Sequence, residues 1–124
     1  MEKEIIHAPQ DAVPYVQKYG VYKREVFGII CLDGSHQVIK KKELFKGGYT
    51  RTLIDFRVLW YEAIKCRASA VILWHNHPSD RTEPSKEDIE MTERIKKGGE
   101  ILGINVLDHL IIGKSNYYSF LENK

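Results

Sequence analysis

A nearly continuous apolar run in the middle of the chain constrains the fold more than any other feature. Residues 68–74 read Ala-Ser-Ala-Val-Ile-Leu-Trp, without alternation between apolar and polar positions. A strand that lacks alternation is buried on both faces, so other elements must cover the sheet on each side. The polar residues that follow from His75 onward end this strand. The run therefore predicts a layered α/β domain.

Weaker patterns predict the other elements. Asp33 and Gly34 form the strongest short hairpin signal, so the apolar segment before them should pair with the segment after them. Apolar residues recur at three- and four-residue spacing in 53–66 and 86–102, which predicts two helices. The expected elements are a short helix over 8–19 interrupted by Pro14 and stopped by Gly20, strands over 25–32 and from 37 to 40 or beyond, a short strand at Leu44 and Phe45 before a Gly47-Gly48 turn, a helix over 53–66 capped by Thr50 or Thr52, the strand 68–74, a helix over 86–102, a strand over 106–112 and a short strand over 117–120.

In chain order these elements predict a mixed β-sheet flanked by helices. In the helix over 86–102 we expect one buried side, made of Ile89, Thr92, Ile95 and Leu102, with Gly98 and Gly99 weakening the helix near its end. Repeats, low-complexity segments and linkers are not seen. The chain has 124 residues, so we expect a single domain over 1–124.

Composition excludes several classes of protein. The hydrophobic fraction of 43% and the charged fraction of 29% exclude a disordered chain, a collagen-like repeat and a coiled coil. No uncharged run approaches the roughly 20 residues of a membrane span. The first residues carry two early acids and no apolar core, which excludes a secretory signal. We therefore expect a cytoplasmic protein that does not enter a membrane.

Charge and cysteine usage exclude other classes. The net charge of +2 is too small to indicate a nucleic-acid partner, so the basic clusters at 40–46 and 94–97 are interpreted as solvated faces. Cys31 and Cys66 lie far apart and form no Cys-x-x-Cys pair, which excludes a thiolate zinc finger and a thioredoxin-type site. Both are expected to be buried thiols.

The polar segment after the apolar run contains the candidate metal ligands. His75 and His77 are two residues apart, so on an extended chain both side chains point to the same face. Their α-carbons would be roughly 6.5 to 7 Å apart, a span that two imidazoles can close onto one ion. Asp88 follows eleven residues after His77, in the first turn of the next helix. Two imidazoles and one carboxylate are the protein ligands of a catalytic zinc site, which leaves the fourth position for water.

The same residues also have structural interpretations. A histidine near the end of a strand is usually an ordinary polar residue. Ser85 and Asp88 fit a capping box, in which each side chain accepts a hydrogen bond from the other residue's backbone N–H. On that pattern alone capping is favoured, although Ser85 can also direct its hydroxyl group toward a ligand.

Several motifs together resemble a known family. His75-x-His77-Pro78, six residues and then Ser85-x-x-Asp88 resemble the metal-binding signature of the JAB/MPN zinc hydrolases, also called JAMM enzymes. The chain is most similar to the catalytic domain of RadC-type proteins, over about 21–122. The segments that carry this similarity are Arg24-Glu-Val-Phe-Gly28, Ala70-Val-Ile-Leu73, His75-Asn-His-Pro-Ser79, Pro84-Ser85 and Val106-Leu-Asp-His-Leu-Ile-Ile-Gly113.

The resemblance implies a JAB/MPN-like fold, with the layered architecture also found in cytidine deaminases, and one zinc ion bound by His75, His77 and Asp88. It implies hydrolysis of an amide bond, peptide or isopeptide, by zinc-activated water. Glu25 corresponds to the family's general base, which takes a proton from that water and then donates it. Ser85 corresponds to the serine that stabilises the tetrahedral intermediate.

The chain departs from the family at some positions. Asn76 stands where peptide-cleaving JAMM enzymes often carry Ser or Thr, although Asn is ordinary there for RadC-like proteins. Asp80 and Arg81 stand where RadC-like loops often have Gly-Asp, so the shape of that loop is not predicted. Thr82 replaces a frequent proline. RadC-type proteins usually carry a preceding helix-hairpin-helix segment, and the roughly twenty residues before Val21 are too few for it. DNA binding is therefore expected to be weak or absent.

Two further polar patterns receive structural interpretations. HNH endonucleases are named for separated residues of a ββα unit, so the contiguous His-Asn-His string does not indicate one. Asp108 and His109 are interpreted as a buried, hydrogen-bonded pair that braces the sheet, in preference to ligands.

The sequence thus predicts a RadC-like zinc hydrolase that acts on a protein or peptide. Two alternatives remain: a non-catalytic binding module that contains zinc, and a DNA-repair-associated accessory protein. The oligomeric state and the substrate are not predicted.

Overall fold

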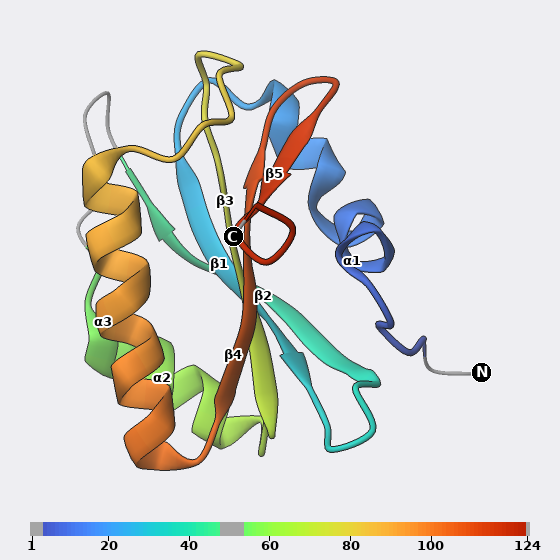
Figure 1. Cartoon of the computed structure of the whole chain (residues 1–124), viewed down its shortest axis with the longest axis vertical. Coiled ribbons are helices and arrows are strands. Elements are labelled where there is room, and N and C mark those ends of the chain that lie inside the picture. Colours follow the sequence, from blue (N-terminus) through green and yellow to red (C-terminus); the bar gives the residue numbers. More distant parts are fainter. Residues whose placement is uncertain (1–3, 48–53, 124) are drawn as a thin grey trace.

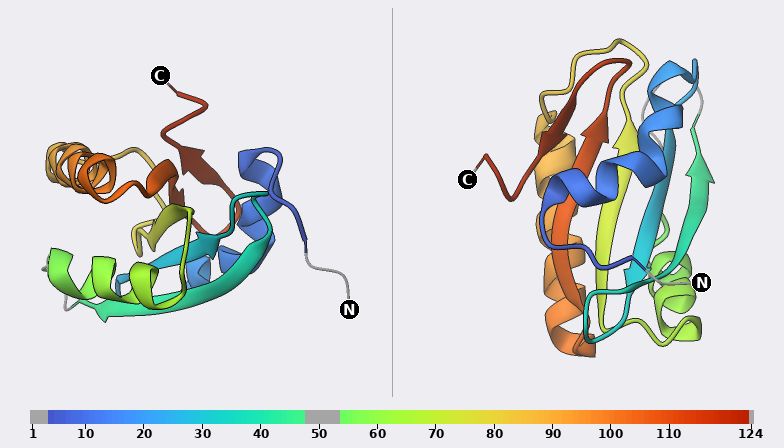
Figure 2. Two further views of the ribbon diagram at one scale, coloured as in Figure 1. Left: turned by 90° about the horizontal axis from the view of Figure 1, so that it is seen from below. Right: turned by 90° about the vertical axis from the view of Figure 1, so that its right-hand side faces the viewer.

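The computed structural model describes residues 4–47 and 54–123 of the chain, which form one five-stranded sheet with helices on both faces (Figures 1 and 2). The strand order is β2-β1-β3-β4-β5, and only the β3–β4 pair is parallel. The elements are α1 (Pro9–Val16), the 3₁₀ helix η1 (Gln17–Val21), β1 (Val26–Leu32), β2 (Val38–Lys46), α2 (Phe56–Lys65), β3 (Ala70–Asn76), α3 (Lys86–Leu102), β4 (Asn105–Ile112) and β5 (Tyr117–Ser119). This mixed α/β architecture confirms the predicted fold class.

The central strand β3 is buried along its whole length, as the apolar run predicts, but it covers 70–76 and not 68–74, so His75 and Asn76 belong to the strand. It lies between β1 and β4, with α1 on one face of the sheet and α2 and α3 on the other (Figure 2). Ala70, Ile72 and Trp74 pack in the core on the α1 side, whereas Val71 and Leu73 pack in the core under α2 and α3. Because side chains alternate along a strand, His75 follows Val71 and Leu73 onto the α3 face, and Asn76 follows Trp74 onto the opposite face.

The amino-terminal half differs from the predictions in four details. Pro14 lies inside α1 without interrupting it, and Gly20 lies within η1 instead of stopping the helix. Gly20 is needed for close packing, because a Cβ there would lie 2.0 Å from the carbonyl oxygen of Gly113. The hairpin after β1 has a loop over 33–37 in which His36, and not Gly34, adopts a positive φ of 62°. Strand β2 includes Leu44 and Phe45 without a break.

Helix α2 begins at Phe56, and Asp55 caps it by accepting a hydrogen bond from the backbone N–H of Arg57 at 3.0 Å. Thr50, Thr52 and Leu53, which the prediction placed at this helix start, lie outside the described residues, as does Gly48 of the expected turn. Cys31 is buried and burial raises the pKa of its thiol to about 12, but Cys66 is only half-buried.

The predicted buried side of α3 is confirmed at Thr92 and Ile95 but not at its two ends. Ile89 and Leu102 are 47% and 45% exposed, whereas Thr92, Ile95 and Gly99 are buried. The two glycines lie within the helix because α3 packs closely against the ring of Trp60. A Cβ at Gly98 would lie 2.8 Å from Nε1 of Trp60. Within the described residues, no helix is long and apolar enough to cross a membrane.

Candidate metal centre

Three predicted ligands meet at the carboxyl end of β3. His75 is the penultimate residue of β3, His77 follows the strand, and Asp88 lies in the first turn of α3. The Nε2 atoms of the two histidines are 3.0 Å apart, and Nε2 of His77 lies 3.1 Å from Oδ2 of Asp88. Nε2 of His75 lies 3.4 Å from Oδ1 of the same carboxylate. The structure therefore brings together, within 4.8 Å, one ligand atom from each of the three residues.

The loop between the histidines and α3 is held by backbone and side-chain hydrogen bonds. The backbone N–H of His77 donates to the carbonyl of Ile112 at 3.1 Å, which ties the loop to the end of β4. Asp80 adopts a φ of 66°, in the left-handed region that favours glycine and tolerates aspartate. Its Oδ1 accepts a hydrogen bond from the backbone of Lys114 at 2.6 Å. Asp80 can thus occupy the position where related loops often carry glycine.

Ser85 and Asp88 form the predicted capping box. The Asp88 N–H donates to Oγ of Ser85 at 3.0 Å, and the Ser85 N–H donates to Oδ2 of Asp88 at 2.9 Å. The same Oδ2 faces His77, so capping and the cluster are compatible functions of one carboxylate. The cap also fixes the orientation of Asp88, since its side chain is held by the start of its own helix. The Ser85 hydroxyl accepts in this box and keeps its own hydrogen for another acceptor.

The ring of His77 is held with a lone pair directed into the cluster. Its Nδ1 lies 2.7 Å from the carbonyl oxygen of Arg81. A carbonyl only accepts hydrogen bonds, so Nδ1 carries the hydrogen and Nε2 of the neutral ring is the acceptor. This is the tautomer in which a histidine binds a metal ion through Nε2.

The electrostatics of the cluster favour a cation. Burial disfavours the charged form of His77, but the Asp88 carboxylate, the Arg81 carbonyl and the charge of Glu25 outweigh burial and raise its pKa. Burial likewise opposes ionisation of Asp88, but hydrogen bonds with His75 and His77 hold the pKa of that carboxyl well below its ordinary value. A proton and a metal ion would therefore compete for the same ligand atoms.

Glu25, the predicted general base, immediately precedes β1. Phe27, two residues further along the chain, pairs with His75 in the β1–β3 register, and the charge of Glu25 acts on His77. The backbone of this segment is held by Asn76, whose side chain is fully buried. Oδ1 of Asn76 accepts from the Val26 N–H at 2.7 Å, and its Nδ2 donates to the carbonyl of Arg24 at 3.0 Å.

The sequence analysis missed the contribution of three residues: Asn76, Thr92 and His109. Asn76 was noted only as a difference from peptide-cleaving JAMM enzymes, yet it fixes the backbone on both sides of Glu25. Nε2 of His109 lies 2.7 Å from Nδ1 of His75, and Nδ1 of His109 lies 2.6 Å from Oγ1 of Thr92. Burial, followed by the electrostatic interaction with His75, holds the pKa of His109 well below its ordinary value.

Asp108 and His109 are both buried and hydrogen-bonded, but their side chains do not pair with each other. Asp108 bonds Ser119 and the backbone N–H groups of His109 and Leu121, which ties β5 and the chain after it to β4. The His109 side chain instead reaches the metal-ligand candidate His75. The predicted bracing function therefore describes Asp108, while His109 belongs to the candidate metal centre.

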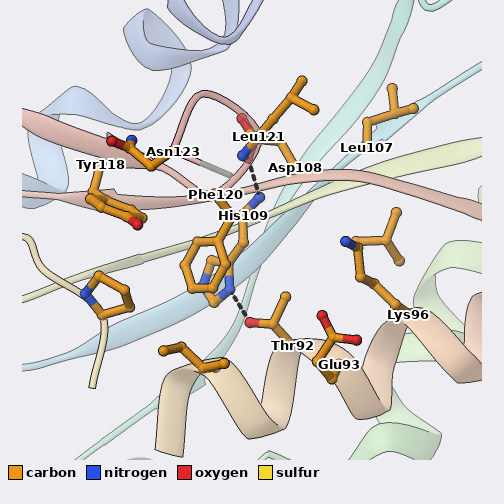
Figure 3. A pocket seen from close by; sticks show the side chains of 13 residues that line it. Thr92, Glu93, Lys96, Leu107, Asp108, His109, Tyr118, Phe120, Leu121 and Asn123 are labelled. Carbon is orange, nitrogen blue, oxygen red and sulfur yellow. Dashed lines mark hydrogen bonds between the residues drawn. The ribbon is translucent and has the colours of Figure 1, made fainter. Parts of the chain in front are cut away.

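A cavity of about 340 Å³ lies between α3 and the β4–β5 end of the sheet (Figure 3). Thr92 and His109 line it together with apolar side chains that include Ile89 and Phe120. None of the three predicted metal ligands is among its lining residues. The cavity thus lies beside the centre and not over it.

The fold and the cluster define an α/β domain with a potential metal centre at the carboxyl end of the central strand of a mixed sheet. Comparison with known proteins then identifies the family: the family model for the RadC-like JAB domain matches residues 6–124, and the chain belongs to that family.

Curated relatives agree with this assignment. A UPF0758 protein of Actinobacillus succinogenes is 46% identical over 101 residues, which are 82% of this chain and 46% of the relative. A UPF0758 protein of Haemophilus influenzae is 48% identical over 101 residues, with the same two shares. A UPF0758 protein of Clostridium perfringens is 42% identical over 118 residues, which are 94% of this chain and 52% of the relative. The chain spans about half the length of these relatives.

Proposed function

We propose that this chain is a zinc-dependent hydrolase of the JAMM type that cleaves an amide bond, peptide or isopeptide, in a protein or peptide substrate. The observation that carries the proposal is the convergence of two histidine Nε2 atoms and one carboxylate at 3.0, 3.1 and 3.4 Å. Zinc binds imidazole nitrogen at about 2.0–2.1 Å, so two such ligands of one tetrahedral ion are about 3.3 Å apart. The donor set and its spacing fit zinc closely.

The number of ligands favours a catalytic site over a structural one. Structural zinc sites are usually closed by four protein ligands, whereas catalytic sites use three. Within the ranges that the structure describes, the cluster contains three His, Cys, Asp or Glu side chains. This count supports the hydrolase over a binding module that keeps zinc for structure.

Each chain residue has a defined task in this proposal. His75, His77 and Asp88 would hold the zinc ion, which would polarise a water molecule and make it nucleophilic near neutral pH. Glu25 takes the proton from that water and delivers it to the leaving amine. The free hydroxyl hydrogen of Ser85 is donated to the oxygen that becomes negative when the carbonyl is attacked.

Metal analysis tests the centre directly. We expect about one zinc per chain in the wild-type protein and a large loss in His77→Ala, because that change removes a ligand. Equal zinc in the two proteins would overturn the proposal. Screening linear peptides and isopeptides with the zinc-loaded protein then tests for amide hydrolysis, and a complete absence of turnover across both would favour the binding module.

We further propose that DNA is not a tight partner of this chain. The basic cluster on β2 is partly neutralised, since Nζ of Lys42 lies 2.6 Å from Glu62 and Nζ of Lys46 lies 3.8 Å from Glu43. Lys41 lies over the ring of Tyr19, at 5.0 Å from its centroid. A titration with duplex DNA at about 150 mM salt should give no complex near the roughly 10⁻⁸ M affinity of specific binders. Tight, sequence-selective binding would favour the DNA-repair accessory protein instead.

A further inference from the structure

We propose that Thr92 and His109 are positioning residues that hold the imidazole of His75 with its Nε2 lone pair directed at the metal position. The inference rests on the proposed zinc site, although its first measurement needs no metal. It assigns a function to two buried polar residues that are not among the candidate metal ligands.

The two residues form a continuous chain of hydrogen bonds from α3 to β3. Oγ1 of Thr92 lies 2.7 Å from the carbonyl oxygen of Asp88. The same Oγ1 lies 2.6 Å from Nδ1 of His109, the contact drawn in Figure 3. Nε2 of His109 lies 2.7 Å from Nδ1 of His75. Thr92, His109 and His75 are 2%, 0% and 1% exposed, so solvent cannot replace these partners. We call Thr92, His109 and His75 the relay.

The direction of every hydrogen bond in the relay follows from its first member. The Asp88 carbonyl only accepts, so the single hydroxyl hydrogen of Thr92 is donated to it. The hydrogen between Thr92 and His109 must then come from Nδ1 of His109, which leaves Nε2 of that ring as an acceptor. Nδ1 of His75 therefore donates to His109, and Nε2 of His75 keeps the lone pair that a metal requires.

The rings of the relay are also fixed in orientation by aromatic neighbours. His109 stacks on Phe120 with centroids 4.8 Å apart and an interplanar angle of 9°. His75 stacks on Phe27 at 5.9 Å and 21°. Stacking limits rotation of both imidazoles, so the hydrogen bonds act on rings that are already close to their final orientation.

The relay joins two of the three proposed ligands. Thr92 at one end of the relay bonds the backbone carbonyl of Asp88, and the ring of His75 forms the other end. His109, the middle member, is contributed by β4. For His77 the Arg81 carbonyl serves the same purpose directly, at 2.7 Å from Nδ1. Outer partners of this kind typically change metal affinity by 10- to 100-fold when they are removed.

The matched variants are Thr92→Val, which removes the hydroxyl at nearly constant shape, and Thr92→Ser, which keeps it. Ser119→Ala removes another buried hydroxyl outside the relay and controls for general destabilisation. Two quantities are measured in the full chain: the histidine tautomers of the metal-free protein near neutral pH, by ¹⁵N NMR of the side chains, and the zinc affinity, by competition with a chelator.

In the wild type we expect His75 and His109 to carry hydrogen on Nδ1. In Thr92→Val the Nδ1–H of His109 loses its acceptor, which favours the other tautomer and turns Nε2–H of His75 toward the cluster. We expect zinc affinity to fall about 10- to 100-fold in Thr92→Val, and to stay within about 3-fold of wild type in Thr92→Ser and Ser119→Ala.

Absence of hydrogen from Nδ1 of His75 in the wild type would overturn the relay, as would wild-type tautomers and affinity in Thr92→Val. An equal loss of affinity in Ser119→Ala would overturn it too, because the effect would then be general. If the wild type binds no zinc, the proposed function fails, and the tautomers of wild type and Thr92→Val still decide the relay by themselves.

Discussion

Asp88 and Asp108 are both shielded from solvent, but the groups around their carboxylates differ in chemistry. Oδ1 of Asp108 accepts from the backbone N–H groups of His109 and Leu121 at 2.7 and 2.9 Å, and its Oδ2 accepts from the Ser119 hydroxyl at 2.6 Å. Asp88 accepts one backbone hydrogen bond, from Ser85, and otherwise faces histidine nitrogens. Around Asp108, the Ser119 hydroxyl and two backbone N–H groups donate hydrogen bonds to the carboxylate. Around Asp88, the carboxylate and the Nε2 atoms of His75 and His77 surround a position that suits a cation. We call these two sets of residues the Asp108 cluster and the Asp88 cluster.

The pKa values of the two carboxyl groups are shifted in opposite directions. Burial raises the pKa of Asp108 despite its three hydrogen bonds, while the histidine contacts hold the pKa of Asp88 well below its ordinary value. A buried acid is therefore not by itself evidence of a site. What distinguishes a metal centre from a structural brace is whether neighbouring atoms donate hydrogen or offer lone pairs.

The largest expected effect tests whether the Asp88 cluster is catalytic. In Glu25→Gln we expect kcat to fall about 10²- to 10⁴-fold, because glutamine keeps the shape but cannot accept a proton. Bound zinc should stay at the wild-type level, measured by elemental analysis beside the rate. Wild-type turnover with zinc bound would contradict the mechanism, and loss of zinc would make Glu25 a ligand and the site more like a structural one.

Ser85→Ala should have the next largest effect. We expect kcat to fall about 10²- to 10³-fold through loss of the donor to the developing negative charge, with zinc retained. Loss of the cap should lower the free energy of unfolding by about 1 kcal/mol, read from denaturant unfolding. A stability loss of that size with an unchanged rate would leave Ser85 with capping as its only function.

Replacing each acid in turn with asparagine sharpens the comparison between the two clusters. Asp88→Asn removes a ligand charge, so we expect zinc affinity to fall at least about 100-fold, more than for an outer partner. Asp108→Asn should leave zinc affinity unchanged, because none of its side-chain partners is a ligand. Chelator competition measures both variants, and equal losses would show that the two clusters are not functionally distinct.

The smallest effect concerns pH. A carboxyl whose pKa is raised by folding binds its proton more tightly in the native state, so it adds stability as pH falls from above that raised pKa toward the ordinary value near 4. The wild type should therefore gain stability relative to Asp108→Asn over this interval. Unfolding curves of metal-free protein at pH 7 and pH 4 measure the change, and a loss relative to the variant would contradict the raised pKa of Asp108.

Much of the fold and the ligand cluster was predictable because the signals are local. The unbroken apolar run predicts a central buried strand, and β3 is that strand. The two-residue spacing of His75 and His77 places both on one face. Ser85 and Asp88 are separated by one helical turn, so the capping box that orients Asp88 can also be recognised from the sequence.

The missed features depend on contacts between distant segments. The Asn76 side chain hydrogen-bonds the backbone next to Glu25, and its partner Val26 lies 50 residues away in sequence. Thr92 and His109 are 17 residues apart and meet only because α3 packs on β4. The buried side of α3 was predicted correctly at Thr92 and Ile95 but not at Ile89, which is exposed next to Asp88 of the cluster.

The sequence by itself determined which residues are available as ligands and the local geometry that places them at one strand end and one helix start. These follow from periods of two and about four residues, which are properties of the backbone. The tertiary structure decided which nitrogen of each histidine faces the centre. That choice depends on acceptors at Arg81 and His109, and the His109 acceptor is brought into place only by the parallel pairing of β3 with β4 and the packing of α3 over them.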